Sequence, residues 1–282
     1  MSVLNKSKIP DAISITALTI LAAFLCYPLL WMFFASFKEN REIFTGIVLL
    51  PEKFSFDAYR DGWRGVSGNT FTRFFANSFL LVIPTALFTV ISSALVAYGF
   101  ARFEFRGKKV LFIILLSTLM LPNSIMLIPR YSIFRDLRVL DSYGPFYMMS
   151  AFACYPFFTY MLVQFIRGIP KELDESARID GCNSFRTLIS ILLPLLKPAL
   201  FSAGLFQFLW TYNDYFNPLI YINSIKKFPV SLALRLTLDA ETVIPWKIVM
   251  AMSSVAVLPV IILFFFCQKY FVEGIATTGI KG

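Results

Sequence analysis

The sequence is poor in the residues that carry catalytic and metal chemistry. Its 282 residues include no histidine, so the commonest general base and the commonest metal ligand are both missing. It has no G-x-x-x-x-G-K-[ST] phosphate loop, so we expect no ATP hydrolysis by this chain. Four cysteines are present without a C-x-x-C pair, and we interpret them as small apolar helix residues. We therefore predict no catalytic residue, no metal site and a protein that is not an enzyme.

Charged residues are also scarce. They make up 15% of the chain, against about 25% in an average soluble domain. Hydrophobic residues reach 57%, against about 45–50%, and 32 of the residues are phenylalanine. A water-soluble protein of this size could not bury so much apolar surface, which predicts a lipid environment. The net charge of +9 does not indicate nucleic-acid binding, because the basic residues lie in short groups between apolar runs.

Long apolar runs predict the fold. A helix rises about 1.5 Å per residue, so about 20 residues cross the roughly 30 Å hydrocarbon core. Backbone groups in lipid must be bonded within their own segment, and the runs lack the alternation of a β-barrel strand. We therefore predict an all-α polytopic membrane protein with six transmembrane helices. The predicted spans are residues 13–36, 77–100, 110–129, 144–166, 198–222 and 246–268.

The loops between these runs set the expected orientation. The numbers of Lys and Arg residues on the two sides of the membrane are equal, so the density of positive charge in the short loops decides the orientation. Residues 101–109 form the stretch with the highest density. We therefore predict that both termini are cytoplasmic. The expected cytoplasmic segments are 1–12, 101–109, 167–197 and 269–282. The expected external loops are 37–76, 130–143 and 223–245.

The cytoplasmic loop 167–197 is long enough to form structure of its own. Pro170 suits the first turn of a helix, and acidic side chains then complement the positive helix end. Gly181 is suited to end this helix in a left-handed conformation, and Asn183 or Ser184 can cap a second helix. The apolar stripe of that second helix consists of Phe185, Leu188, Ile189 and Leu192. We expect a helix, a sharp turn and a second helix that fit a partner's groove.

The same loop resembles the EAA loop of ABC importer permeases. The matching positions are Glu175, Ala177, Gly181, Ile191, Leu193 and Pro194. Ser176 departs from the motif, which usually has Ala there. The resemblance implies a MetI-like permease fold with its core at about 73–270, in which the loop forms a coupling helix held by the ATPase subunit. The matching residues would then carry the coupling.

Two further stretches resemble the carbohydrate-import branch of that family. Residues 77–109 are similar to its second span and basic loop, and residues 268–282 are similar to the tail of the smaller maltose-type permeases. The second resemblance implies that Glu273, Gly274 and Gly279 contact the ATPase. Glycines at 274, 279 and 282 would let an extended tail enter a narrow gap.

The resemblance also implies partners and a location. We expect a second homologous permease subunit, two ATP-binding subunits and an external solute-binding protein. ATP and Mg would bind in the ATPase, and this chain would hold no cofactor. The protein would cross the bacterial-type plasma (inner) membrane several times, and no nucleic-acid partner is expected.

Polar residues in the apolar runs mark a candidate substrate pathway. Polar and charged groups within a membrane are costly and usually face a cavity or the bundle interior. The candidates are Gln207, Tyr212, Asn213, Asp214 and Asn217 in the fifth run and Asn123 in the third. The stretch from Trp210 to Asp214 is similar to a Trp-Asn-Asp feature of sugar permeases, with two residues inserted. The alternative is that Asp214 and Asn217 only fix helix packing at the outer end.

The sequence therefore favours a permease subunit of an ATP-driven, binding-protein-dependent importer. We expect its solute to be a sugar or oligosaccharide and its mechanism to be alternating access. The same machinery could carry a non-sugar solute such as glycerol phosphate or a polyamine, and the solute of the binding protein would distinguish these. A membrane enzyme would turn over without an ATPase partner. A membrane scaffold would bind without ATP-dependent uptake.

Overall fold

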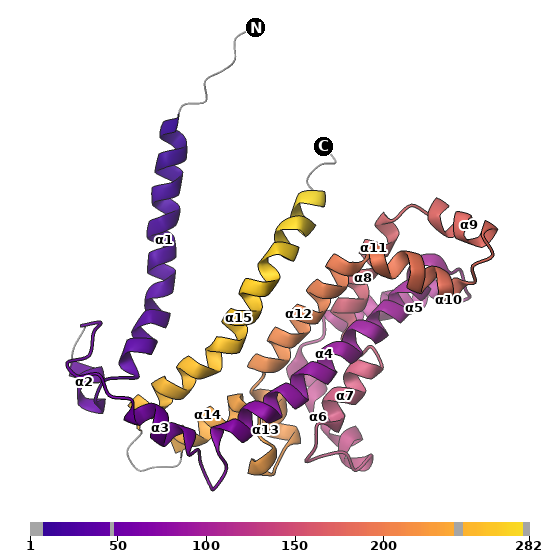
Figure 1. Cartoon of the computed structure of the whole chain (residues 1–282). Coiled ribbons are helices and arrows are strands. Elements are labelled where there is room, and N and C mark those ends of the chain that lie inside the picture. The colour runs from indigo at the N-terminus through magenta and orange to yellow at the C-terminus, as the bar shows by residue number, and fades with distance from the viewer. Residues whose placement is uncertain (1–7, 46–47, 240–244, 279–282) are drawn as a thin grey trace. The chain divides into compact units, whose positions relative to one another are not determined.

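The computed structural model describes residues 8–45, 48–239 and 245–278, and these ranges are helical with no named strand (Figure 1). The all-α fold is thereby confirmed. The chain forms two compact units, which are described separately. One consists of 1–71 and 234–259, and the other of 72–233 and 260–282.

The first unit contains the helices nearest the N-terminus. These are α1 (Lys8–Ala35), α2 (Asn40–Thr45), α3 (Asp57–Trp63) and the beginning of α15 (Trp246–Thr278). The Lys38 amino group is buried and donates to the carbonyl of Val48, and Ser36 Oγ lies 2.7 Å from the hydroxyl of Tyr59. In contrast, the most apolar stretch of α1, within Ile13–Ala35, has no buried residue. That stretch therefore needs lipid or another subunit to cover it.

The second unit holds most of the helices. Its elements are α4 (Phe71–Arg102, whose first residue belongs to the other unit), α5 (Lys108–Leu119), α6 (Asn123–Asp136), α7 (Gly144–Ala151), α8 (Pro156–Gly168), α9 (Glu172–Ile179), α10 (Ser184–Thr187), a π-helical turn (Leu188–Leu192), α11 (Leu193–Leu195), α12 (Lys197–Asn213), α13 (Phe216–Tyr221), a 3-10 turn (Ile225–Lys227) and the start of α14 (Val230–Asp239).

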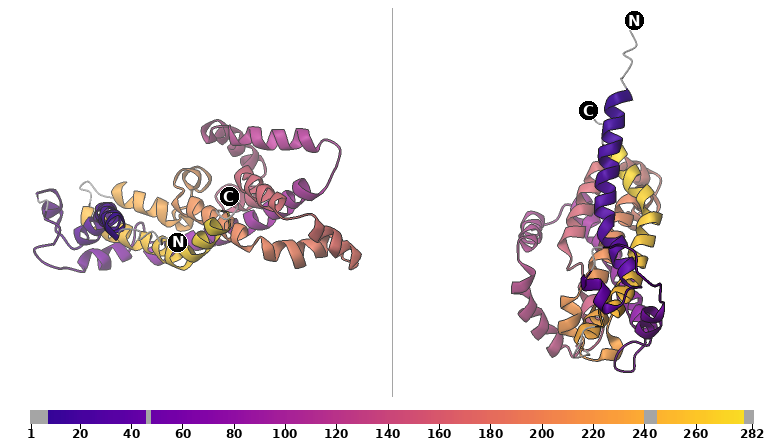
Figure 2. Two further views of the ribbon diagram at one scale, coloured as in Figure 1. Left: turned by 90° about the horizontal axis from the view of Figure 1, so that it is seen from above. Right: turned by 90° about the vertical axis from the view of Figure 1, so that its left-hand side faces the viewer.

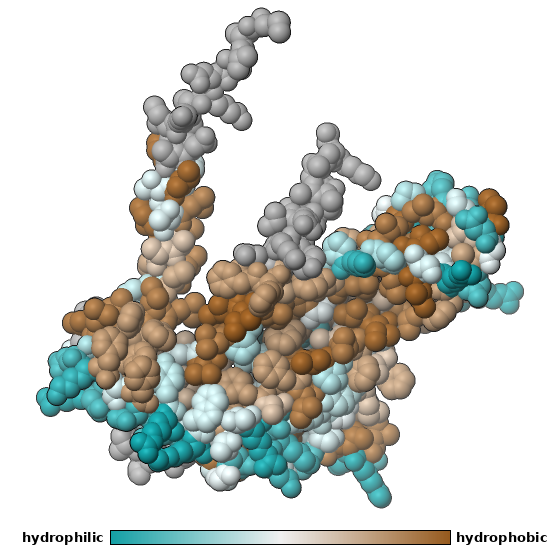
Figure 3. All heavy atoms as spheres, in the orientation of Figure 1, coloured by the Kyte–Doolittle hydropathy of each residue, from teal (hydrophilic) through white to brown (hydrophobic). Residues whose placement is uncertain are grey.

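The membrane-crossing helices follow the apolar runs. Four segments of the described residues are long and apolar enough to cross by themselves, and two bent helix pairs bring the number to as many as six. The four segments are Ile13–Ala35, Phe71–Arg102, Gly144–Gly168 and Trp246–Cys267. Their outward apolar side chains appear brown in Figure 3, whereas teal side chains lie beside brown ones at the end that carries α9. The protein is therefore a multi-pass membrane protein.

The third apolar run is not the single helix expected over 110–129. It is divided into α5 and α6, which meet at 108°, and Figure 2 shows α6 running apart from α5 in both views. Pro122 has extended backbone (φ −60°, ψ 134°) at the break. A proline cannot donate the helical hydrogen bond and disfavours helical geometry in the residue before it, so the helix ends before Pro122.

The fifth run also differs from the expected 198–222 helix. Helix α12 ends at Asn213, Asp214 is extended, and α13 begins at Phe216. Pro218 has no N–H for the carbonyl of Asp214, four residues earlier. That carbonyl accepts a hydrogen bond from Ser231 Oγ instead, at 2.9 Å. Proline chemistry thus interrupts the helix, and a tertiary contact satisfies the backbone oxygen that is left over.

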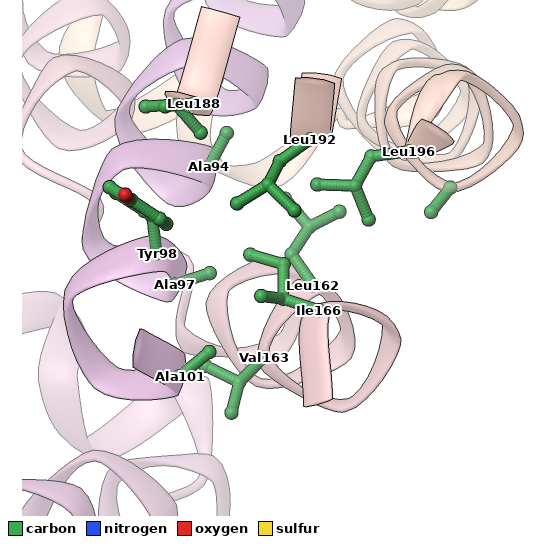
Figure 4. Close-up of a cluster of buried hydrophobic side chains, with 11 residues drawn as sticks. Ala94, Ala97, Tyr98, Ala101, Leu162, Val163, Ile166, Leu188, Leu192 and Leu196 are labelled. Atoms are coloured by element: carbon green, nitrogen blue, oxygen red, sulfur yellow. The ribbon is translucent and has the colours of Figure 1, made fainter. Parts of the chain in front are cut away.

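The largest apolar cluster of the second unit joins α4, α8 and the helix after α9 (Figure 4). Alanines at 94, 97 and 101 lie on one face of α4, because they are three and four residues apart. Their small side chains let larger ones pack closely against α4. Those larger residues are Leu162, Val163, Ile166, Leu188, Leu192 and Leu196. The second half of the 167–197 loop is therefore part of the protein core.

An ion pair and several hydrogen bonds join the segment around Asp141 to the segment around Lys227. The Asp141 carboxylate accepts hydrogen bonds from the backbone N–H groups of Asn223 and Ser224, at 3.0 and 2.7 Å, and from Lys227 Nζ at 2.8 Å. Burial alone would raise its pKa, but these hydrogen bonds hold the pKa of Asp141 well below its usual range. On α4, the Asn77 side chain donates to the carbonyls of Lys226 and Phe228. One segment, 223–228, is thus held from two sides.

We predict that Leu192→Ala destabilises the protein. The Leu192 side chain is fully buried, and removing a buried leucine side chain costs about 2–5 kcal/mol. The midpoint of thermal unfolding of the purified protein in detergent should fall by several degrees. The control is Ile189→Ala, because Ile189 lies on the same turn with 46% of its surface exposed. Equal losses for the two variants would contradict the packing described for this cluster.

We predict that acid loosens the segment that Asp141 holds. Because its pKa is lowered on folding, the carboxylate stabilises the fold above the ordinary carboxyl pKa of about 4, and this contribution is lost as the pH falls below that value. The protection factors of the Asn223 and Ser224 amides against hydrogen exchange should stay high down to about pH 5 and fall below about pH 4. Asp141→Asn should make exchange fast throughout, whereas Asp136→Asn, at an exposed carboxylate, should not.

Candidate coupling loop and membrane cavity

Helix α9 is built as the acidic pattern of the loop predicts. Glu172, Asp174 and Glu175 lie in its first turn, where negative charge complements the positive helix end. The N–H groups of Asp174 and Glu175 both donate to the carbonyl of Lys171. Pro170 lies just before the helix, which begins at Glu172, rather than in the first turn as expected.

Gly181 ends α9 in the left-handed conformation that the sequence predicts, with φ of 79°. The N–H of Cys182 donates to the carbonyl of Ala177 at 2.8 Å, and the N–H of Gly181 donates to that of Arg178 at 3.0 Å. These two bonds are the Schellman arrangement of a helix end. A Cβ atom at Gly181 would meet nothing within 4 Å, so the backbone angle is the reason for glycine in the isolated chain.

The tip of the loop exposes large apolar side chains next to an acidic one. Ile179 is 87% exposed and Phe185 is 64% exposed, while Glu175 is exposed beside them in sequence. Ala177 is the one residue of α9 that is buried, so it supports the helix from the inner side. We define Leu173, Glu175, Ile179, Gly181 and Phe185 as the loop tip. Its combination of apolar and acidic groups is suited to contact with another protein.

An ion pair holds α9 against the end of α4. Arg102 Nε and Asp174 Oδ2 lie 3.0 Å apart, and their side chains are only 6% and 17% exposed. The two atoms lack the in-line geometry of a hydrogen bond, but Arg102 Nη2 donates to the carbonyl of Ile169 at 2.9 Å. One turn earlier on α4, the hydroxyl of Tyr98 donates to the carbonyl of Ser184 at 3.0 Å. We call these contacts the α4 brace.

Sequence reasoning did not find the α4 brace. Asp174 was explained by its place in the first turn of α9, and Arg102 by the density of positive charge in its loop. A sequence gives no signal that two such residues, far apart in the chain, form a pair. The structure shows that these contacts join the end of α4 to the loop.

The second helix of the loop runs directly into the core. Asn183 is its cap, with Oδ1 accepting from the N–H of Arg186 at 2.8 Å. A π-helical turn at Leu188–Leu192 precedes Pro194, whose ring would clash with a carbonyl in a regular helix. Of the other predicted coupling residues, Leu193 packs against the apolar cluster and Ile191 is half-buried. The second helix of the loop is therefore packed directly against α4 and α8.

The second unit also contains a cavity of about 1290 Å³. Five of the predicted pathway residues line it: Gln207, Asn213, Asp214, Asn217 and Asn123. The sixth, Tyr212, is not among the lining residues; it is 5% exposed, and its ring stacks on that of Phe208 at 5.7 Å. The predicted residues in the wall lie on α6, α12 and α13 and at the break before α13, and other lining residues lie on α5, α7 and α8.

The cavity wall combines bonded polar groups with open aromatic surface. The amide groups of Gln207, Asn213 and Asn217 donate to Thr211 Oγ1, to the carbonyl of Leu209 and to Asp214 Oδ2, at 2.8, 2.9 and 2.7 Å. Trp210 is 49% exposed, and its ring centroid lies 5.2 Å from that of Phe157, which also lines the cavity. An aromatic surface of this kind can contact the apolar face of a sugar ring.

Asp214 and Asn217 also fix the break between α12 and α13. Asp214 Oδ1 accepts hydrogen bonds from the N–H groups of Phe216 and Asn217 at the start of α13. The packing role that the sequence left open is therefore present, and it does not exclude a place in the cavity wall, because both residues are there as well.

The C-terminal candidates lie at the end of α15. The backbone is helical through Thr278, so Glu273 and Gly274 belong to a helix rather than to the extended tail expected from the sequence. Gly279 lies outside the described residues. The contact of this tail with an ATPase remains a prediction.

Known proteins resemble the chain in sequence and in fold. Residues 90–277 match the family described as "Binding-protein-dependent transport system inner membrane component". The arabinooligosaccharides transport system permease protein AraQ of Bacillus subtilis is 31% identical, over 91% of this chain and 90% of that relative. The trehalose/maltose transport system permease protein MalG of Thermococcus litoralis is also 31% identical, over 93% and 94%.

A solved structure has the same fold. It is described as a bacterial ABC transporter involved in the import of the acidic polysaccharide alginate. One of its chains superposes with a TM-score of 0.81 at 25% identity, over 96% of this chain and 100% of that chain.

We predict that loss of the Arg102 charge loosens the loop. Arg102→Gln leaves the Asp174 carboxylate poorly paired at a mostly buried site, which should cost about 2–4 kcal/mol locally. Amides of 172–182 should exchange faster, and Asp174→Asn should have a similar effect. The double variant should lose less than the sum of the two, since both remove one interaction. The control is Arg106→Gln, at an exposed arginine four residues later. Additive losses would contradict the pairing.

Proposed function

Since this chain belongs to the family of inner membrane components of binding-protein-dependent transport systems, we propose that it is one permease subunit of an ATP-driven importer of a sugar or oligosaccharide. The family is a transport component and not an enzyme. The observation that carries the proposal is the loop 167–197, whose exposed tip and buried second helix connect an outer surface directly to the core.

The loop transmits the motion of a separate ATPase. Closure of two ATP-binding subunits pulls the loop tip, and the α4 brace and the apolar cluster pass the movement to α4, α8 and α12. The cavity then opens alternately to the two sides of the membrane. The change follows from ATP binding one state of the assembly better than the other. ATP and Mg stay in the ATPase, and this chain contributes no cofactor.

The partners are a second homologous permease, two ATP-binding subunits and an external solute-binding protein. Unpaired apolar surface supports a membrane partner: the apolar stretch of α1 has no buried residue, and Phe24 is 74% exposed. Both termini lie on the cytoplasmic side, together with the loop tip. The positive charge of 101–109 supports this orientation.

The solute passes through the cavity of the second unit. The relatives named for arabinooligosaccharide and trehalose/maltose transport support a saccharide. Trp210 and Phe157 supply the aromatic surface that a sugar ring needs, and Asn123, Gln207 and Asn213 supply polar groups. Glu273 and Gly274 reach the ATPase from the end of α15, together with Gly279.

Replacement of Gly181 tests the docking role. Gly181→Leu should abolish co-purification with the ATPase and reduce ATP-dependent sugar uptake at least about tenfold, because it combines backbone strain with a bulky group at the loop tip. Gly181→Asn should be milder, since Asn tolerates the left-handed conformation.

The matched control is Gly107→Leu. Gly107 is also left-handed, with φ of 83°, and a Cβ there would likewise meet nothing within 4 Å. This variant carries the same kind of strain outside the loop and should retain assembly and uptake. Normal assembly and uptake by Gly181→Leu would count against docking through this loop.

A further inference from the structure

The wall of the cavity also carries a cation. Arg130, on α6, is half-buried and is the one basic residue among the described residues that line the cavity. It shares the cavity wall with Tyr155, just before α8, and with Asp214 and Asn217. Arg130 was not among the residues predicted for the pathway, because it lies at the edge of the expected external loop.

Arg130 lacks an ion-pair partner in the described part of the chain. Its one hydrogen bond within the described residues runs from Nη1 to Asn123 Oδ1 at a long 3.5 Å. On the same helix, Arg135 has a carboxylate partner, with Nη2 at 3.0 Å from Asp136 Oδ1. A guanidinium group has five N–H donors, so most of the donors of Arg130 are available to a ligand.

The acidic residue of the cavity does not neutralise Arg130. Asp214 uses Oδ1 to accept from two backbone N–H groups and Oδ2 to accept from Asn217 Nδ2 at 2.7 Å. The carboxylate is therefore committed to the start of α13. No ion pair joins Asp214 to Arg130 within the described residues.

A half-buried guanidinium group without a counter-charge is unfavourable by itself. Removing a charge from water costs several kcal/mol unless a counter-charge compensates, and charges in membrane proteins usually mark the path of a substrate or ion. A single arginine matches a single negative charge. A carboxylate and a phosphate can both accept two parallel N–H···O bonds from an arginine. The single negative charge of a carboxylate matches that of one arginine, whereas a phosphate group carries about −1.5 to −2.

We propose that Arg130 binds the carboxylate of a passing uronic-acid saccharide, while Trp210 and Phe157 contact the apolar face of its ring. This inference rests on the proposed function and narrows its solute from sugars in general to acidic ones. The solved relative that takes part in alginate import has a solute of this chemical class. Arg130 then determines specificity within the cavity, in addition to the selection by the external binding protein.

Uptake by intact cells tests this proposal with all natural partners present. The probes are radiolabelled disaccharides of galacturonate, glucuronate and mannuronate, and the neutral disaccharides of galactose, glucose and mannose. Cells lacking the chromosomal copy carry the wild-type chain or one of its variants. Wild-type cells should accumulate at least one acidic probe tenfold more than its neutral counterpart.

Substitution of Arg130 should then remove the discrimination. Arg130→Gln should lower uptake of the acidic probe at least tenfold with intact ATPase co-purification, and Arg130→Lys should retain part of it, since a lysine keeps the charge without the paired donors. Arg135→Gln, on the same helix with its own partner, should leave uptake unchanged.

The contrary outcomes are distinct. Uptake of neutral probes alone by the wild type would overturn the inference and leave the proposed importer standing. An equal loss of acidic and neutral uptake in Arg130→Gln would assign Arg130 to packing, to a lipid headgroup or to a carboxylate of the second permease, and would also overturn it. Absence of ATP-dependent uptake of every probe by the wild type would contradict the proposed function itself, and the inference with it.

Discussion

The close packing of α4 against α8 and the second helix of the loop 167–197 is the interaction on which the rest of this structure depends. Three alanines on one face of α4 make the approach possible, and leucines at 188, 192 and 196 fill the space opposite. Because these leucines follow α9 after a single sharp turn, the loop tip cannot move far without moving the core. A rigid joint between an exposed tip and a bundle of membrane helices is what a motor-driven permease requires.

Electrostatic attraction also holds α9 against the end of α4. The ion pair between Arg102 and Asp174 is mostly shielded from water, so its attraction is screened less than that of an exposed pair. It also fixes the direction of α9, since the same guanidinium binds the carbonyl of Ile169. Near the start of α4, Asn77 binds the segment 223–228, which Asp141 also holds. Helix α4 is therefore held near both of its ends, which suits it to carry movement across the membrane.

The cavity lies where helices are interrupted. Helix α5 breaks before α6 at Pro122, and α12 breaks before α13 at Asp214. Each break frees polar groups within a membrane protein, where irregular backbone is tolerated next to protein or a water-filled space. Asn123, Arg130, Asp214 and Asn217 all lie at or after these breaks and all line the cavity. The helix breaks next to Pro122 and Pro218 thus bring polar side chains into the wall of the cavity.

The sequence by itself determined the all-α membrane class and the turn at Gly181, because each depends on local composition. Hydropathy requires lipid, and a left-handed turn favours glycine. The tertiary structure alone decided that Leu188 and Leu192 of the predicted stripe are buried in the protein's own core and that Tyr212 packs away from the cavity. It also decided that Arg102 meets Asp174 and that Arg130 meets no carboxylate in the described part of the chain. These features depend on which residues from distant parts of the chain become neighbours. Pairwise distances of that kind leave no periodic trace in a single sequence.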